Sequence, residues 1–135
     1  MTVPLKETQR DSEAEAIRQT ALDYIEGWYT GNTERMERSL HPELAKRIVI
    51  PAANNANEDR LSQMSAMRLV QLTRSGMGII PEYEQRKEVI ILDRDGRSAS
   101  AKIVASTWID YLHLAKWEGR WVIVNVLWEL NSPHA

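Results

Sequence analysis

The segment DYLHLAKWEGRWVIVNVLWEL, residues 110–130, decides the fold, because it predicts two long strands joined by a tight turn. Apolar side chains fill both halves, and Glu118-Gly119 lies between them where a two-residue hairpin loop belongs. A loop of that length fixes the register, so Trp117 pairs with Arg120 and each earlier residue acquires a defined partner. The strands are therefore expected over 110–117 and 120–130.

This register predicts which side chains share a face of the sheet. One face is expected to hold Asp110, Leu112, Leu114, Trp121, Ile123, Asn125 and Leu127. The opposite, outer face is expected to hold Tyr111, His113, Ala115, Trp117, Val122, Val124, Val126 and Trp128. Both faces are too apolar to lie against water, so we expect helices on one and a second copy of the chain on the other. The homodimer is predicted to bury Val122, Val124, Val126 and Trp128.

Another hairpin precedes this one, with Asp95-Gly96 as its turn and strands expected over 86–92 and 98–105. Counting from that turn places one set of apolar side chains on a single face: Ile90, Leu92, Ala99, Ala101, Ile103 and Ala105. The alanines favour close packing under a helix, and a cavity floored by small side chains is the alternative.

The N-terminal part has the spacing of helices instead. The run Ser12-Glu13-Ala14-Glu15 is typical of a capping box, in which a hydroxyl and a carboxylate satisfy the first free amides of a helix. An apolar stripe at helical spacing follows as far as Trp28, and Gly31 suits the left-handed residue that ends a helix. We therefore expect a first helix of about four turns.

Two shorter helices and two strands are expected before the hairpins. Asn32 or Thr33 caps a second helix, and Ser65 caps a third that ends at Gly76. Residues 45–50 and 61–64 have strand patterns, with a loop at 51–57 between them. Helices followed by hairpins predict an α+β fold, with three helices on one face of a curved antiparallel sheet. We expect one domain over 12–130, with flexible termini at 1–11 and 131–135.

Composition excludes several classes of function. The 135 residues include no cysteine, which removes disulfides and thiolate metal sites, and the three histidines are not clustered. The net charge of −2 is spread over both signs, so nucleic acid and anionic membranes are not expected partners. No export signal or long apolar run is present, which predicts a cytoplasmic protein. No glycine-rich phosphate loop is present either, and no cofactor is expected.

Five stretches carry a family resemblance: ALDYIEGWYTGN (21–32), LHPELAKR (40–47), MSAM (64–67), DYLHLAK (110–116) and WVIVNVLW (121–128). With the order of elements, they resemble the cone-shaped nuclear transport factor 2-like superfamily, which includes SnoaL-like domains, ketosteroid isomerases and scytalone dehydratase. The chain is most similar to the bacterial family described as putative lumazine-binding, over residues 14–129. The resemblance implies a cystatin-like cone with a pocket between the first helix, the third helix and the concave sheet. It also implies a homodimer through the outer sheet face.

The resemblance also suggests roles for two positions. By its distance from Gly31, Tyr24 resembles the tyrosine that donates a hydrogen bond to the oxyanion in ketosteroid isomerases, although a core tyrosine with its hydroxyl at the rim is the other interpretation. The general base of those isomerases would correspond to Ile48, and no carboxylate stands there. The isomerase mechanism is therefore not carried over.

The remaining candidates follow from position in the predicted fold. Asp110 is the carboxylate expected on the concave face. Apolar neighbours there would raise its pKa and suit it to act as a base or a hydrogen-bond acceptor. The alternative is that Asp110 is a residue at the strand end that bonds a loop amide. Asn125 would bind an amide or carbonyl edge, and His41 would shuttle protons near the pocket mouth or cap a helix. The other expected pocket residues are Trp28, Arg47, Met67, Tyr83, Leu112 and Trp121, with Arg47 as the contact for an anionic group.

Three interpretations of function remain open. The first is a small-molecule-binding protein with an enclosed, mostly apolar pocket for a planar, lumazine-like ligand. The second is a cofactor-free acid–base enzyme of the isomerase, cyclase or dehydratase type that uses Asp110, His41 and Tyr24. The third is a dimeric interaction module whose pocket is vestigial. The missing carboxylate at Ile48 favours binding over catalysis.

Overall fold

The computed structural model describes residues 5–53 and 57–131. The helices are α1 (Leu5–Thr30), α2 (Thr33–Ser39), α3 (Ala66–Ser75) and the short 3-10 helix η1 (Glu82–Glu84). The strands are β1 (Leu40–Ile50), β2 (Arg60–Ser65), β3 (Lys87–Arg94), β4 (Ser98–Ala105), β5 (Trp108–Trp117) and β6 (Arg120–Leu130). The predicted loop at 51–57 and the predicted flexible termini fall partly outside the described residues.

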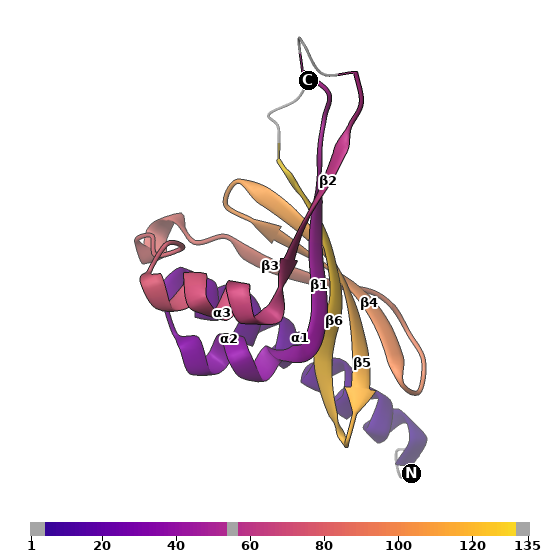
Figure 1. Cartoon of the computed structure of the whole chain (residues 1–135). Coiled ribbons are helices and arrows are strands. Elements are labelled where there is room, and N and C mark those ends of the chain that lie inside the picture. Colours follow the sequence, from indigo (N-terminus) through magenta and orange to yellow (C-terminus); the bar gives the residue numbers. More distant parts are fainter. Residues whose placement is uncertain (1–4, 54–56, 132–135) are drawn as a thin grey trace.

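The strands form one curved sheet in the order β2-β1-β6-β5-β4-β3. Neighbouring strands are antiparallel except β1 and β6, which are parallel and join the N-terminal strand pair to the C-terminal hairpins. Figure 1 shows α1, α2 and α3 on one side of this sheet and the β1–β2 hairpin extending beyond the other strands. The expected α+β architecture with three helices on a curved sheet is confirmed.

The local signals at most helix ends are confirmed. The Asn32 side chain accepts a hydrogen bond from the Arg35 amide at the start of α2, and Ser65 accepts one from the Arg68 amide at the start of α3. Gly31 has the positive φ that ends a helix in the left-handed conformation. These caps fix where the chain leaves each helix and enters the sheet.

The predicted start of the first helix at Ser12 is wrong, because α1 already begins at Leu5. Ser12 and Glu15, the two residues of the expected capping box, therefore lie inside the helix and not at its start. Between them, the Glu13 carboxylate lies 2.7 Å from Lys116 Nζ and accepts a hydrogen bond of 2.9 Å from Trp121 Nε1. This tertiary contact joins α1 to the β5–β6 hairpin.

The β5–β6 register is confirmed near the turn and shifts beyond it. Trp117 pairs with Arg120, and the regular pairing continues as far as Leu114 with Ile123. A β-bulge follows, so that His113 pairs with Asn125. One extra residue in a strand reverses the facing of every later side chain. Asn125 and Leu127 therefore lie on the outer face, and Val126 and Trp128 turn inward, opposite to the prediction.

The β3–β4 hairpin has the same kind of irregularity. Its turn lies one residue later than expected, since the Asp95 amide donates to the Ser98 carbonyl, and a bulge lies between Ile91 and Asp93. The bulge places Val89 and Ile91, instead of Ile90 and Leu92, on the inner face. The inner position of the β4 alanines is confirmed, and they are closely packed: Ala99, Ala101 and Ala105 are all buried.

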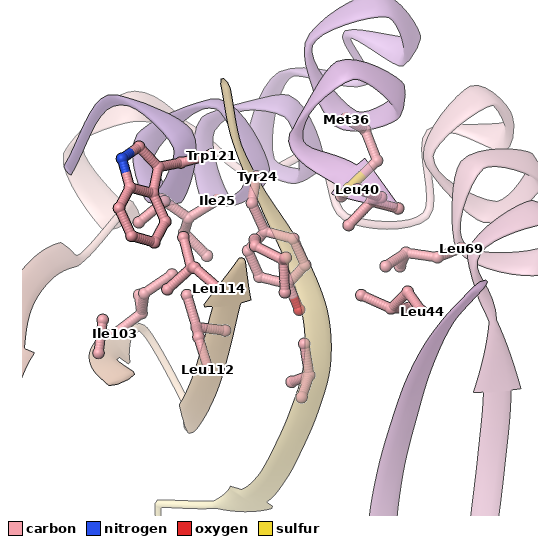
Figure 2. Packing of buried hydrophobic residues seen from close by; sticks show 14 of the residues in the cluster. Tyr24, Ile25, Met36, Leu40, Leu44, Leu69, Ile103, Leu112, Leu114 and Trp121 are labelled. Atoms are coloured by element: carbon pink, nitrogen blue, oxygen red, sulfur yellow. The ribbon is translucent and has the colours of Figure 1, made fainter. Parts of the chain in front are cut away.

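The core fills the space between the helices and the concave face of the sheet. Figure 2 shows Tyr24 in the middle of this cluster, with Ile25, Leu112 and Leu114 on one side and Leu44 and Leu69 on the other. Buried polar contacts anchor α1: Tyr29 Oη donates to the Arg86 carbonyl at 2.7 Å. None of the described helices combines the length and the low charge needed to cross a lipid bilayer.

Candidate functional site

Three polar side chains from different elements meet inside the apolar core. Tyr24 comes from α1, Lys46 from β1 and Asp110 from β5. Lys46 Nζ donates a hydrogen bond of 2.6 Å to Tyr24 Oη, and it lies 5.2 Å from the centre of the Tyr24 ring and 5.4 Å from that of Trp128. We call these three residues, Tyr24, Lys46 and Asp110, the inner cluster.

The sheet geometry explains why Lys46 points inward. In the parallel pairing of β1 with β6, Lys46 lies beside Val126, which is buried on the concave face. Side chains alternate along a strand, so Leu44 shares this face and Arg47 does not. Lys46 as a residue is half-buried, but its ammonium group is desolvated among the rings of Tyr24 and Trp128.

Asp110 is the most deeply buried member of the cluster. The residue is 0% exposed, and its Oδ2 accepts a hydrogen bond of 2.9 Å from Trp108 Nε1. Its Oδ1 has no hydrogen-bond partner among the described residues. A buried polar atom normally finds a partner, because leaving one unpaired costs about 1–3 kcal/mol. Asp110 therefore keeps an acceptor in the interior without a well-formed hydrogen bond, and the nearby Tyr24 hydroxyl affects the pKa of this carboxyl group.

The protonation of these groups is coupled. Burial raises the pKa of Asp110, and the opposing influence of Lys46, Trp108 and Tyr24 does not reverse the shift. Burial lowers the pKa of Lys46, although the negative charge of Asp110 works against that shift. Burial and the Asp110 charge raise the pKa of Tyr24 well above its usual range. The cluster can thus hold a proton on the carboxyl group or on the amine, which is the property that acid–base chemistry requires.

The structure brings together only part of the predicted site. Tyr24, Asp110 and Leu112 lie together on the inner side, and Trp121 is buried at the other end of β6, where it binds Glu13. Trp28 is half-buried and packs against the core beside Gly78, where an added Cβ would overlap the indole ring.

Several other predicted positions are wrong. Asn125 lies on the outer face because of the β6 bulge, and there it contacts His113 Nδ1 at 3.2 Å and Arg47 at 3.4 Å. Arg47 therefore also lies outside the cone. Met67 and Tyr83 are exposed, at 72% and 87%, because each projects away from the core. None of these side chains lies beside the inner cluster.

His41 does not join Tyr24 and Asp110 either. Its ring packs edge-on against Trp117 with the ring centres 4.8 Å apart, and its Nδ1 accepts a hydrogen bond from the Glu43 amide. It stands at the beginning of β1, beside the β5–β6 turn, whereas Lys46 lies further along that strand. The expected group of Asp110, His41 and Tyr24 is thus replaced by one in which Lys46 is the third residue.

The hollows that the described residues line are on outer surfaces, and none of these is lined by the inner cluster. One of about 330 Å³ lies between α2, the start of β1 and α3, and includes Met67. Another of about 330 Å³ lies on the outer sheet face, where Arg47, His113 and Asn125 meet. A third of about 280 Å³ adjoins it beside Tyr111 and Trp128. The residues that the sequence assigned to an inner pocket therefore divide between the cone and these outer surfaces.

The fold is that of a known class, the cone-shaped nuclear transport factor 2-like proteins. Residues 12–129 match the model of the family described as "Putative lumazine-binding", and the chain belongs to that family. No curated protein matches the chain.

Solved structures share the fold at low sequence identity. A nuclear transport factor 2-like protein of unknown function from Shewanella baltica has a TM-score of 0.68 and 19% identity, with 96% of this chain and 98% of that chain covered. One with a cystatin-like fold from Novosphingobium aromaticivorans has a TM-score of 0.68 and 9% identity over 97% and 90%. A ketosteroid isomerase-like protein from Erwinia carotovora has a TM-score of 0.61 and 11% identity over 90% and 98%. Identities this low support a common fold alone.

Proposed function

We propose that the chain binds a small planar molecule inside the cone, with the polar edge of the ligand against the inner cluster. The observation that carries this proposal is the free Oδ1 of Asp110, a buried acceptor that no described residue satisfies. Ligand sites combine mostly apolar walls with a few polar groups that orient the ligand. The aromatic and aliphatic side chains around Tyr24 supply the walls, and the inner cluster supplies the polar groups.

The arrangement of the cluster suits a ligand that presents a donor next to an acceptor. Asp110 Oδ1 would accept a hydrogen bond from a ring N–H, and Lys46 Nζ would donate one to the neighbouring carbonyl. A cyclic amide or imide has this pattern. Lumazine, a pteridine dione, combines it with a flat ring system, in keeping with the description of the family.

Two measurements test this proposal. Native mass spectrometry of the purified protein would show a bound small molecule as added mass, and titration with lumazine would follow binding by calorimetry. We expect Asp110→Asn to weaken binding by about tenfold, equivalent to about 1.4 kcal/mol, because the amide can no longer accept as a carboxylate does. The carboxamide retains the shape of the side chain, so the variant should remain folded.

The matched control is Asp93→Asn, which changes an exposed aspartate on β3 far from the inner cluster. It should bind lumazine as the unaltered protein does. The proposal is wrong if no small molecule co-purifies and neither lumazine nor related cyclic amides bind, or if both variants bind equally well.

We also propose that two copies of the chain associate through the outer sheet face. This face has exposed apolar side chains on neighbouring strands: Val49, Leu61, Tyr111 and Leu127. Leu127 lies next to Tyr111 on β5, and Val49 lies next to Leu61 on β2, so the four form a band across the sheet. Apolar bands of this kind are typical of interfaces between subunits. The β6 bulge turns Val126 and Trp128 inward, and Val122 is buried, so we propose this band in place of the predicted interface of Val122, Val124, Val126 and Trp128.

A further inference from the structure

Lys46 has surroundings unlike those of a surface lysine. Its Nζ lies 2.6 Å from Tyr24 Oη and close to the rings of Tyr24 and Trp128. Among the residues that the structure describes, no carboxylate forms a salt bridge with it within 4.0 Å, and Asp110 acts on it from further away. One proton of the Lys46 amine is therefore hydrogen-bonded to Tyr24. No described carboxylate lies close enough to hold the amine in its charged form by a salt bridge.

One proton-carrying group, the Tyr24 hydroxyl, lies next to this amine, and a second, the Asp110 carboxyl group, is near enough for its charge to affect the pKa of Lys46. The Tyr24 hydroxyl accepts the hydrogen bond from Lys46 and retains its own proton for donation. Asp110 is completely buried, and its Oδ1 is free to give or take a proton. A nucleophile with an adjacent acid and base is the arrangement found in covalent catalysis by side chains.

We propose that Lys46 condenses with the carbonyl group of an aldehyde or ketone to form an imine, with Asp110 and Tyr24 transferring the protons. The proposal rests on the proposed function, since the carbonyl compound must first enter the cone. It assigns a covalent chemistry to the inner cluster and a chemical class to its ligand.

The condensation balances without an oxidant or a metal. The lone pair on the neutral Nζ attacks the carbonyl carbon, and the carbonyl oxygen takes up a proton from the carboxyl group of Asp110. One of the amine protons then returns to that carboxylate, either directly or through Tyr24. In the second step the C–O bond breaks, the hydroxyl group leaves as water with a proton from Asp110, and Nζ gives its second proton to the resulting carboxylate. In net terms the amine loses two protons, the released water contains two, and the carboxyl group of Asp110 is regenerated.

The electrostatics of the cluster favour the required protonation states. Burial lowers the pKa of Lys46, which increases the share of neutral amine, and burial raises the pKa of Asp110, which increases the share of the acid form. Both shifts reduce the amount of charge inside the core, so they arise from the same desolvation.

The surroundings of Lys46 define the side from which a small carbonyl compound would enter. Tyr24 and Asp110 are closed off from solvent, whereas the residues Lys46, its β2 neighbour Met64 and Trp128 are only half-buried. The amine itself is desolvated. The proposal therefore requires a small aldehyde to enter between these half-buried side chains.

Reductive trapping tests the proposal. The full chain is incubated with benzaldehyde, a planar aromatic aldehyde, and sodium cyanoborohydride, which reduces an imine to a stable benzylamine. Peptide mass spectrometry then locates the benzyl groups. We expect Lys46 to be labelled several-fold faster than Lys102, which is the matched control because its Nζ also lies over a tyrosine ring, that of Tyr111, but on the outer face. Labelling of Lys46 should also persist to lower pH than labelling of a free lysine derivative.

Variants separate the proposed roles. Lys46→Arg should abolish the fast labelling, and Lys102→Arg should leave it unchanged. Asp110→Asn and Tyr24→Phe should slow the labelling of Lys46 but not that of Lys102, an effect that general loss of packing would not confine to one lysine. Circular dichroism confirms that each variant is folded.

Benzyl alcohol, which lacks the carbonyl group, distinguishes the two proposals. If it or lumazine binds while Lys46 is labelled no faster than Lys102, the imine proposal is overturned and the binding function stands. If neither compound binds and Lys46 is not preferred, both proposals fail.

Discussion

Lys46 and Asp110 place two ionisable groups in a mostly apolar part of the core, and each reduces the free-energy cost of burying the other's charge. The Asp110 charge supports a charged Lys46, and the Lys46 charge supports an ionised Asp110. Removal of one partner of such a buried pair leaves the other without compensation, whereas removal of both can be nearly neutral. The two residues are therefore expected to be energetically coupled.

A double-mutant cycle measures this coupling. We expect Lys46→Met and Asp110→Asn each to lower the free energy of unfolding, and the double variant to lose less than the sum of the two. The difference should be about 0.5–3 kcal/mol, the range found for residues of one polar network. Urea unfolding of the four proteins gives the four free energies. Additive losses would show that the two groups do not sense each other.

Gly78 provides a second prediction at the level of a single residue. A Cβ at this position would overlap the indole ring of Trp28, which packs against the core. Gly78→Ala should therefore lower the free energy of unfolding by about 1–3 kcal/mol, as overpacking usually does. Gly96→Ala is the control, because no atom lies within 4 Å of its added Cβ. Thermal melts in which both variants are equally stable would contradict the close packing of Trp28.

The sequence allowed Asp110 to be predicted as an inner residue, but not Lys46. Asp110 is counted along β5 from a local turn, and the bulge lies on β6, so the count to Asp110 is unaffected. The facing of Lys46 depends on the parallel pairing of β1 with β6, two strands far apart in the chain with no turn to set their register. Strand alternation shows that Lys46 and Leu44 share one face of β1. It does not show which of the two faces is buried.

At the level of elements, the local turn and cap signals predicted where strands and helices meet. The β-bulges made the predicted facing of strand residues wrong beyond them. Asn32, Ser65 and Gly31 act at the helix ends where the sequence placed them. A bulge leaves no comparable local signal, because any residue can be the extra one. The predicted facing of Asn125 failed for this reason, and with it the expected position of the outer interface.

The contact between α1 and α2 gives a pH-dependent prediction. Asp23 on α1 accepts hydrogen bonds of 2.9 Å from Arg35 Nε and of 2.9 and 3.0 Å from Arg38 on α2. Burial alone would raise the pKa of Asp23, but the hydrogen bonds from Arg38 and Arg35 outweigh it and hold the pKa below the ordinary value of 3.8. Because the folded state binds this proton more weakly than the unfolded state, the ionised carboxylate stabilises the fold above that value.

We therefore expect Asp23→Asn to lower the free energy of unfolding by about 1–2 kcal/mol at neutral pH, in the range for hydrogen bonds to charged groups. The difference from the unaltered protein should shrink as the pH falls below 3.8 and the native Asp23 takes up its proton. Urea unfolding over a pH series measures this. Glu15→Gln, a change of an exposed carboxylate on the same helix, should show no such dependence. A loss that stays constant down to acid pH would refute the ionic contact.

At the level of the whole molecule, the band on the outer sheet face is the surface through which we propose that two copies associate. Its members lie on β1, β2, β5 and β6, so the band crosses the parallel junction of the sheet. Leu127 is central to it, since it is paired with Tyr111 on one side and with Arg47 on the other.

Leu127→Glu is expected to convert the dimer into a monomer, because a carboxylate would have to be buried in the interface. In the separated subunit the new carboxylate lies beside Arg47, so the fold should be retained. Leu92→Glu is the matched control: Leu92 is 51% exposed and Leu127 is 52% exposed, but Leu92 lies on the edge strand β3. Size-exclusion chromatography with light scattering gives the molar mass. A monomeric unaltered protein, or a Leu127→Glu dimer, would refute the proposed interface.

The position of β6 in the middle of the sheet has a consequence for biosynthesis. It is the last of the described strands to leave the ribosome, yet among them it alone pairs with both the β2–β1 pair and the β5-β4-β3 group. Until it emerges, the nascent chain holds two incomplete half-sheets with unprotected edges, which are the features that chaperones recognise and that promote aggregation. Completion of this fold is therefore expected to follow translation of residues 120–130 and not to proceed stepwise along the growing polypeptide.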